Sequence, residues 1–159
     1  MSEMTNDGGQ WWPSSTTNQE DQKMAQMGIG AMLYALSGGS KKDPKDYYGK
    51  TIISAEIKDE QLRLRFSDGT GLRLWDDGQS CCEHRYMSTD DDVQTLVGGV
   101  LARIEAKAGP YQEDEYEVQE QIFVEVGTDK GFITLVNHNE HNGYYGGFGL
   151  SVDDLEVGQ

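Results

Sequence analysis

The chain has 159 residues and carries 28 acidic against 13 basic side chains, a formal net charge of −15. This length fits a single domain, and so acidic a chain repels phosphate backbones, which argues against direct nucleic-acid binding. The longest apolar-leaning stretch, Ala25 to Leu36, contains two glycines and is too short to cross a bilayer. Met1 to Gln10 lacks the basic start and apolar run of a signal peptide. We therefore expect a cytoplasmic protein with no membrane association.

Residues 1–46 predict an arm, a helix and a linker. Residues 1–18 are rich in Ser, Thr, Asn and Gly and have no hydrophobic period, so we interpret them as a flexible arm. Trp11 and Trp12 lie in this arm, where they either dock on the body of the domain or anchor a partner. Residues 19–46 predict a helix followed by a Gly- and Ser-containing linker. We expect the helix to make the protein a homo-oligomer.

Residues 47–159 have the alternation of a single β-rich domain. Strands are expected at residues 51–58, 61–67, 71–75, 121–126, 132–136 and 148–152. Asp68-Gly69 is a strong turn signal between the second and third of these strands. A short helix should follow near residue 90, capped by Ser88 or Thr89, with three aspartates in its first turn: Asp90, Asp91 and Asp92. The fold class is therefore mainly β (α+β), with antiparallel sheets.

The strand pattern of the first half returns in the second half, which predicts a duplicated three-strand unit. Residues 49–58 match residues 98–107 at a shift of 49. The next two strands match at a shift of 60, and an insertion in the acidic excursion at residues 108–117 accounts for the difference between the two shifts. The two repeats would span residues 47–97 and 98–152.

Each repeat ends in a polar loop, and the shift of 60 aligns residues 77–85 with 137–145. Because equivalent strands end on related sides of a pseudo-symmetric sheet, we expect the two loops to converge. The second loop combines imidazoles, phenols, amides and glycines, which suit a planar, nucleotide-like ligand; it is otherwise a tight hairpin whose aromatics cover a sheet edge. The candidate ligand-binding residues are Asp76, Asp77, Gln79, Glu83, Arg85, Tyr86, Asn139, Glu140, His141, Asn142, Tyr144 and Tyr145.

All the cysteines and histidines of the chain lie in these two loops: Cys81, Cys82, His84, His138 and His141. Thiolates and imidazoles suit zinc, although neither Cys-Cys-x-His nor His-x-x-His has the usual zinc spacing. The expected cofactor is therefore none, with zinc as an alternative. Two adjacent cysteines do not make a disulfide scaffold and fit a reducing cytoplasm. A thiol or metal-dependent hydrolase built from this set is a further alternative, but we expect no enzyme and no catalytic residue.

A dense acidic patch lies in the excursion, where Glu113, Asp114 and Glu115 are consecutive. Such a patch is either a solvated surface that keeps the protein soluble or a complement to a basic partner surface. Together with Trp11 and Trp12, these three residues are the candidate partner-binding set.

Two strings, Trp75 to Met87 (WDDGQSCCEHRYM) and His138 to Phe148 (HNEHNGYYGGF), resemble a family of unknown function common in bacteriophages and prophages. The resemblance covers roughly Tyr47 to Val152. It implies a small protein of a phage or mobile element that acts in the host cytoplasm, and it implies no activity.

On this basis we expect a non-enzymatic phage or prophage protein that inhibits host or defence machinery through protein contact. The alternatives are sequestration of a small nucleotide-like ligand by the two loops, the hydrolase above, and a virion or assembly component.

Overall fold

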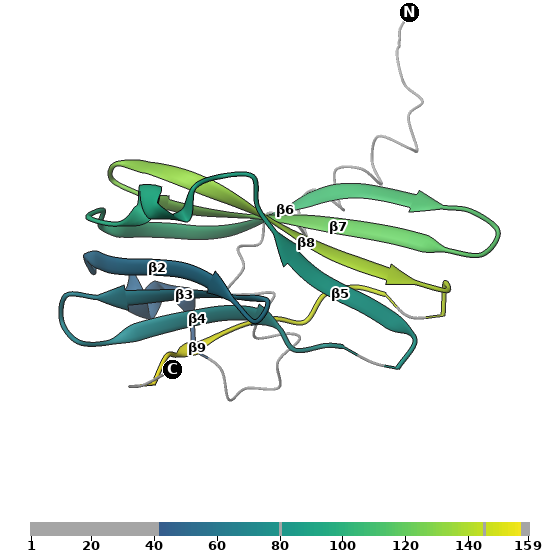
Figure 1. Ribbon diagram of the computed structural model, residues 1–159, viewed down its shortest axis with the longest axis horizontal. Coiled ribbons are helices and arrows are strands. Elements are labelled where there is room, and N and C mark those ends of the chain that lie inside the picture. The colour runs from purple at the N-terminus through teal and green to yellow at the C-terminus, as the bar shows by residue number, and fades with distance from the viewer. Residues whose placement is uncertain (1–41, 80, 145, 157–159) are drawn as a thin grey trace, which may run out of the picture.

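The computed structural model describes most of the chain from residue 42 onward: residues 42–79, 81–144 and 146–156. They form two layers of β-sheet (Figure 1). The predicted arm, with Trp11 and Trp12, and the predicted helix within residues 19–36 lie outside the described residues. Among the helices that are described, none has the length and apolar character needed to cross a membrane.

Short 3-10 turns, η1 and η2, are the only helices in the described part of the chain; the other elements are strands. In chain order the elements are η1 (Pro44–Tyr47), β2 (Ile52–Lys58), β3 (Gln61–Phe66), β4 (Gly71–Asp76), β5 (Glu83–Ser88), η2 (Val93–Leu96), β6 (Leu101–Glu113), β7 (Val118–Thr128), β8 (Gly131–His141) and β9 (Leu150–Asp154). The prediction of a mainly β fold with antiparallel sheets is confirmed.

Two four-stranded antiparallel sheets share one hydrophobic core. The first sheet has the strand order β2-β3-β4-β9 and the second has the order β5-β8-β7-β6. In β3, Leu62, Leu64 and Phe66 are buried while the residues between them are partly exposed, as a two-residue period requires when one face of a sheet is covered. Their partners across the core include Val124 and Leu135 of the second sheet.

Each sheet is completed by a strand from the other half of the chain. β2, β3 and β4 form a meander, as do β6, β7 and β8. β5 follows β4 in the chain but pairs with β8, and β9 follows β8 but pairs with β4 (Figure 1). The predicted three-strand unit was therefore incomplete: each half supplies a fourth strand, and the two fourth strands are exchanged.

Matching features mark the beginning of each half. The two 3-10 turns, η1 and η2, begin at Pro44 and Val93, and the aspartates that cap them, Asp43 and Asp92, are related by the same shift of 49. Gly49 and Gly98 follow with φ of 89° and 87°, in the left-handed region that glycine tolerates best. Strands β2 and β6 then carry a bulge at equivalent positions. These matches support the shift of 49, whereas common descent of the halves stays a prediction.

The predicted shift of 60 for the later strands was slightly too small. Leu64 pairs with Ala55 and its counterpart Val126 pairs with Ile104, so the second strands are related by a shift of 62, from position 64 to position 126. The third strands are related by a shift of 61, from position 72 to position 133. The shift decreases from 62 to 61 between the second and third strands because the β7–β8 turn is shorter than the β3–β4 turn. The sequence match had treated these two turns as equal in length. The insertion in the second half is therefore slightly longer than the sequence match indicated.

The short helix between the halves begins later than predicted. Asp92, and not Ser88 or Thr89, is its cap, because the Asp92 side chain accepts the N–H of Gln94 at the start of the 3-10 turn. Ser88 is instead the last residue of β5, whose pairing with β8 continues to that point.

The domain body begins before the predicted boundary at Tyr47. Lys42 donates its backbone N–H to the Val152 carbonyl of β9, and Tyr47 at the end of η1 is buried in the core. Most of the described part of the predicted linker is therefore a fixed piece of the domain.

The predicted excursion is an extension of the β6–β7 hairpin. Pairing continues from the main sheet out to Glu113 and Val118. Pro110 lies on β6, an edge strand, where a missing N–H is tolerated. We call residues 109–119 the distal hairpin.

Candidate functional site

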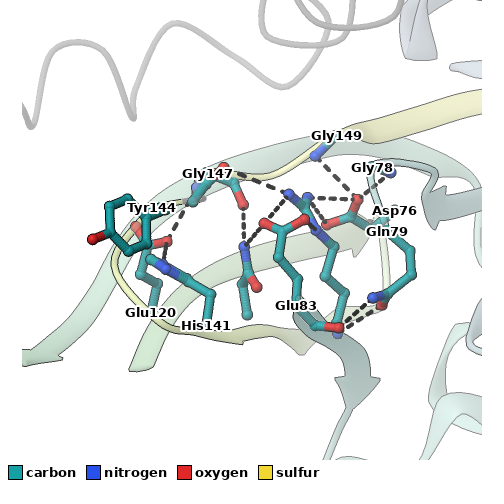
Figure 2. Close-up of polar contacts among 12 residues, drawn as sticks. Asp76, Gly78, Gln79, Glu83, Glu120, His141, Tyr144, Gly147 and Gly149 are labelled. Atoms are coloured by element: carbon teal, nitrogen blue, oxygen red, sulfur yellow. Dashed lines mark hydrogen bonds and ion pairs between the residues drawn. The ribbon is translucent and has the colours of Figure 1, made fainter. Parts of the chain in front are cut away.

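The two predicted polar loops, residues 77–85 and 137–145, lie side by side as expected, but part of each is strand, because β5 begins at Glu83 and pairs with β8, which continues to His141. The connections that carry the exchanged strands between the layers are residues 77–82 and 142–149. The N–H of Asp77 donates to the carbonyl of Gly149 at 2.9 Å. The N–H of Gly149 donates to Asp76 Oδ1 at 3.1 Å, as Figure 2 shows. The Ser151 hydroxyl donates to Asp77 Oδ2 at 3.0 Å. Residues 77–82 and 142–149 are therefore joined where they cross.

Arg85 lies at the centre of this crossover, between two carboxylates. Its Nη1 donates to Asp76 Oδ1 at 3.0 Å, and its Nη2 donates to Glu83 Oε1 at 2.7 Å. The side chains of Arg85, Glu83 and Asp76 are 8%, 2% and 10% exposed. Burial lowers the pKa of Arg85, but the hydrogen bonds and negative charges of Glu83 and Asp76 outweigh that effect and raise it. The Arg85 guanidinium is therefore buried and positively charged, and its ion pairs link β4 to β5.

Asn139 of β8 connects this ion network to the second loop. Its side chain is fully buried, and Nδ2 donates both to Glu83 Oε1 and to the Gly147 carbonyl, each at 3.0 Å. Arg85 also reaches the Gly146 carbonyl at 3.5 Å. The Asn139 side-chain amide therefore holds the backbone of the connection between β8 and β9. We call the set Asp76, Glu83, Arg85, Asn139, Glu120 and His141 the crossover network.

His141 and Glu120 extend the crossover network towards the end of β8. Nδ1 of His141 accepts the N–H of Gly143 at 3.0 Å, which leaves the proton on Nε2, 2.8 Å from Glu120 Oε2. The same carboxylate oxygen accepts the N–H of Gly147 at 3.1 Å. The His141 side chain is 3% exposed, so this imidazole is a buried structural group that braces the loop.

Glycines make the close crossing possible. A Cβ on Gly78 would lie 2.6 Å from the Arg85 guanidinium, and one on Gly149 would lie within 3.2 Å of backbone atoms of Gly78. Gly147 has a φ of 77°, where an L-residue is strained. Gly78 and Gly149 are thus needed for the close approach of one connection to the other.

The opposite face of β5 and β8 carries a column of three rings, of which two are stacked and the third is tilted. His84 and Tyr86 have ring centroids 4.8 Å apart, and Tyr86 and His138 stack at 4.2 Å with an interplanar angle of 6°. The Tyr86 hydroxyl donates to Glu140 Oε2 at 2.9 Å, and Ser88 Oγ lies 2.9 Å from His138 Nε2. Burial lowers the pKa of His138, against the opposing charges of Glu140 and Glu60.

Side chains also occupy the free edge of β5. Gln79 receives the N–H of Arg85 on its side-chain oxygen and donates its amide N–H to the Glu83 carbonyl. Glu60 accepts the Met87 N–H at 2.7 Å from the β2–β3 turn, where it has a positive φ of 59°. Gln79, a predicted ligand-binding residue, therefore takes the place of a neighbouring strand.

The predicted zinc ligands are distributed over different surfaces. Cys81 and Cys82 lie in the turn before β5, and His84 and His138 belong to the ring column. His141 points to the other face of β8, where it contacts Glu120. Within residues 42–79, 81–144 and 146–156, no three Cys, His, Asp or Glu side chains form a group that could hold a metal ion.

The distal hairpin and the end of β8 beside it present exposed aromatic and acidic side chains. Tyr111 and Tyr116 are 59% and 79% exposed, and Tyr144, at the same end of the second sheet, is 89% exposed. Glu113 and Glu115 are also exposed. Asp114 has a different role, since its Oδ1 accepts the N–H groups of Tyr116 and Glu117 at 2.8 Å and so holds the turn.

Among the other predicted ligand-binding residues, Asn142 accepts the Tyr144 N–H at 3.1 Å, and Tyr145 lies outside the described residues. Sequence reasoning missed Glu120 and Glu60. Only the position of Glu120 opposite Asn139 in the β7–β8 register shows that it reaches the crossover. Nothing in the local sequence marks Glu60 as a cap for a distant strand.

A family model described as a domain of unknown function, DUF7448, matches residues 45–150. No similar curated protein and no similar solved structure was found. The match begins in η1 and ends at the first residue of β9, so it includes both halves and both crossing connections. The chain therefore belongs to the DUF7448 family of domains of unknown function.

Proposed function

We propose that this protein is a non-enzymatic binding protein that contacts a basic protein surface through the distal hairpin. We further propose, from the resemblance to a bacteriophage and prophage family, that it acts in a host cytoplasm and inhibits host or defence machinery. The observation that carries the proposal is the exposure of tyrosines and carboxylates together at one end of the second sheet.

The tyrosines provide the anchoring chemistry. Tyr116 and Tyr144 are exposed over most of their surface, and a tyrosine supplies a large rigid contact with a polar tip at low entropic cost. Aromatic residues of this kind are enriched among those that dominate binding energy at protein interfaces. Three of them at one end of a sheet, Tyr111, Tyr116 and Tyr144, are a suitable set of anchors.

The carboxylates define the partner. Glu113 accepts the Tyr111 hydroxyl at 3.0 Å and Glu115 precedes Tyr116, in a chain of net charge −15. A surface of one sign accelerates association with an oppositely charged partner and discriminates against others. The partner surface should therefore be basic, and binding should weaken as salt screens the charges.

Capture of a small ligand by the two loops has less support. Asp76, Glu83, Arg85 and Asn139 hold one another and the crossing backbone. A ligand that used these groups would have to displace buried ion pairs and hydrogen bonds, which is costly. Tyr144, a predicted ligand-binding residue that is 89% exposed, belongs to the surface shared with the distal hairpin.

The test is a pull-down from host lysate with the full chain as bait, at low and at physiological salt. Glu113→Lys/Glu115→Lys should lose the retained basic partner, and Tyr116→Ala/Tyr144→Ala should lose it as well. Asp114 stays unchanged because it holds the turn.

The matched control is Asp90→Lys/Glu105→Lys, which makes the same change in net charge at exposed positions away from the hairpin. It should retain the partner. Equal loss with both charge-reversed variants would show that only total charge matters, and unchanged binding in the hairpin variants would refute the proposed surface.

A further inference from the structure

The turn that precedes β5 presents two thiols to solvent side by side. Cys81 and Cys82 are both exposed and are not joined in a disulfide, and their Sγ atoms are 3.3 Å apart. This separation places the two sulfur atoms in direct contact. Cysteines outside disulfides are usually buried, so an exposed adjacent pair is unusual.

The turn is held on both sides, which positions the thiols. Asp76 receives the Gly78 N–H before the turn, and Gln79 bonds across it to Glu83 and Arg85. The cysteines lie inside the segment that Gln79 closes. Groups held in contact react with each other far faster than free groups do, because their relative freedom has already been lost.

We propose that Cys81 and Cys82 form a redox-sensitive dithiol site that small-molecule disulfides oxidise reversibly to a disulfide between adjacent residues. A thiolate of one cysteine attacks a sulfur of the small disulfide, forms a mixed disulfide and releases the first small thiol. The second cysteine, as its thiolate, then attacks the protein sulfur of that mixed disulfide and releases the second small thiol. The two cysteines together lose two electrons and two protons, and the reagent gains them as two thiols.

Ring strain makes the product easy to reduce. Consecutive Cα atoms are about 3.8 Å apart across a trans peptide, which is shorter than the separation of about 4.4 Å or more that ordinary disulfides span. Strained and exposed disulfides have more oxidising potentials and are the labile ones. The site therefore suits a signal that a thiol-rich cytoplasm resets and does not suit a permanent crosslink.

The proposed site is separate from the distal hairpin and does not depend on the proposed partner. Oxidation of the two cysteines should change the structure only locally, at the free edge of β5, because Gln79 connects the segment that contains the cysteines to that edge.

The test uses the reduced full chain with oxidised glutathione, followed by alkylation of the remaining thiols and intact-mass measurement. The wild-type protein should lose two hydrogens, fall from two alkylatable thiols to none, and recover both with excess reduced glutathione. Cys81→Ser and Cys82→Ser each keep one thiol and should stop at a single glutathione adduct. Peptide fragmentation should place the bridge between the two cysteines.

Accumulation of glutathione adducts on the wild-type protein without the bridged species would overturn the proposal. So would disulfide-linked dimers as the main product, or a failure of the wild-type thiols to react under conditions that modify the single variants.

Discussion

The crossover network and the distal hairpin are both rich in charged side chains, but those of the crossover network are mostly buried and those of the hairpin are mostly exposed. In the crossover network Arg85 is 8% exposed and bonded to two carboxylates, and Asn139 is fully buried. In the distal hairpin Tyr116 is 79% exposed. The first region directs its polar groups towards the chain itself, whereas the second directs them towards solvent.

This difference teaches that a chemically rich loop is not by itself a binding site. An exchanged strand must cross from one sheet to the other, and the crossing backbone leaves N–H and carbonyl groups that need partners. Asp76, Asn139 and Glu120 supply those partners. The residues with the most suggestive chemistry in the sequence are therefore the ones that the topology itself requires.

The largest expected effect comes from removing the central cation. Arg85→Ala leaves Asp76 and Glu83 buried without their counter-charge and should cost about 3–5 kcal/mol of unfolding free energy. The matched control is Arg103→Ala, which removes a cross-strand pair with Glu125 whose arginine is 35% exposed, and it should cost less than about 1 kcal/mol. Urea denaturation followed by fluorescence measures both. Equal losses would remove the distinction between the crossover and ordinary surface pairs.

Substitution of a buried and an exposed histidine, His141 and His84, also compares the crossover network with the surface. His141→Ala removes a partner from Glu120 and from the Gly143 N–H and should destabilise the protein by about 1–3 kcal/mol. His84→Ala, at a side chain that is 70% exposed, should change stability by no more than about 0.5 kcal/mol. Thermal and urea denaturation give both values. An unchanged unfolding free energy in His141→Ala would show that His141 does not hold the fold and would make it a candidate for ligand binding again.

A smaller effect is expected from pH at the ring column. Burial lowers the pKa of His138 below its usual value of 6.5, so the unfolded chain binds a proton before the folded one as the pH falls. The stabilisation from neutral His138 is complete above about pH 6.5 and is lost as the pH falls through the lower folded value. The free energy of unfolding, measured from pH 7.5 downward, should fall more steeply for wild type than for His138→Gln. Parallel curves would contradict this assignment.

The smallest effect on stability is expected at the distal hairpin. Glu113→Lys/Glu115→Lys changes only exposed side chains and should alter the unfolding free energy by no more than about 0.5 kcal/mol, although it should abolish partner binding. Denaturation of this variant beside the Asp90→Lys/Glu105→Lys control measures the difference. A loss as large as that of Arg85→Ala would show that the hairpin acids hold the fold.

Much of the fold could be predicted from hydrophobic alternation. Leu62, Leu64 and Phe66 marked β3, and the match at a shift of 49 identified strands that prove equivalent in pairing and in their bulges. β5 was missed because Glu83, His84 and Arg85 open it without an apolar residue, and its pairing with β8 depends on residues far away in the sequence.

The sequence indicated where the polar residues gather, but not that they hold the fold. The repeat predicted that the two loops converge, and Asp77 does contact Gly149, but much of each predicted loop proves to be paired strand in β5 and β8. What the sequence could not show is that Asp76, Arg85 and Asn139 are one network, because no local pattern distinguishes a carboxylate that awaits a ligand from one that a distant arginine already occupies. Glu120 shows the same limit, since its partner His141 lies on the next strand of the sheet.

Amide hydrogen exchange on the full chain tests the central claim most directly. In the crossover, Gly78 and Gly149 donate their N–H groups to Asp76, and Gly147 donates to Glu120. The account predicts that peptides covering 76–86 and 139–150 exchange slowly, through openings that approach global unfolding, while the hairpin tip at 113–118 exchanges early through local opening. Fast exchange in both crossing connections, at the rate of the hairpin tip, would contradict the claim that the crossover network holds the exchanged strands in place.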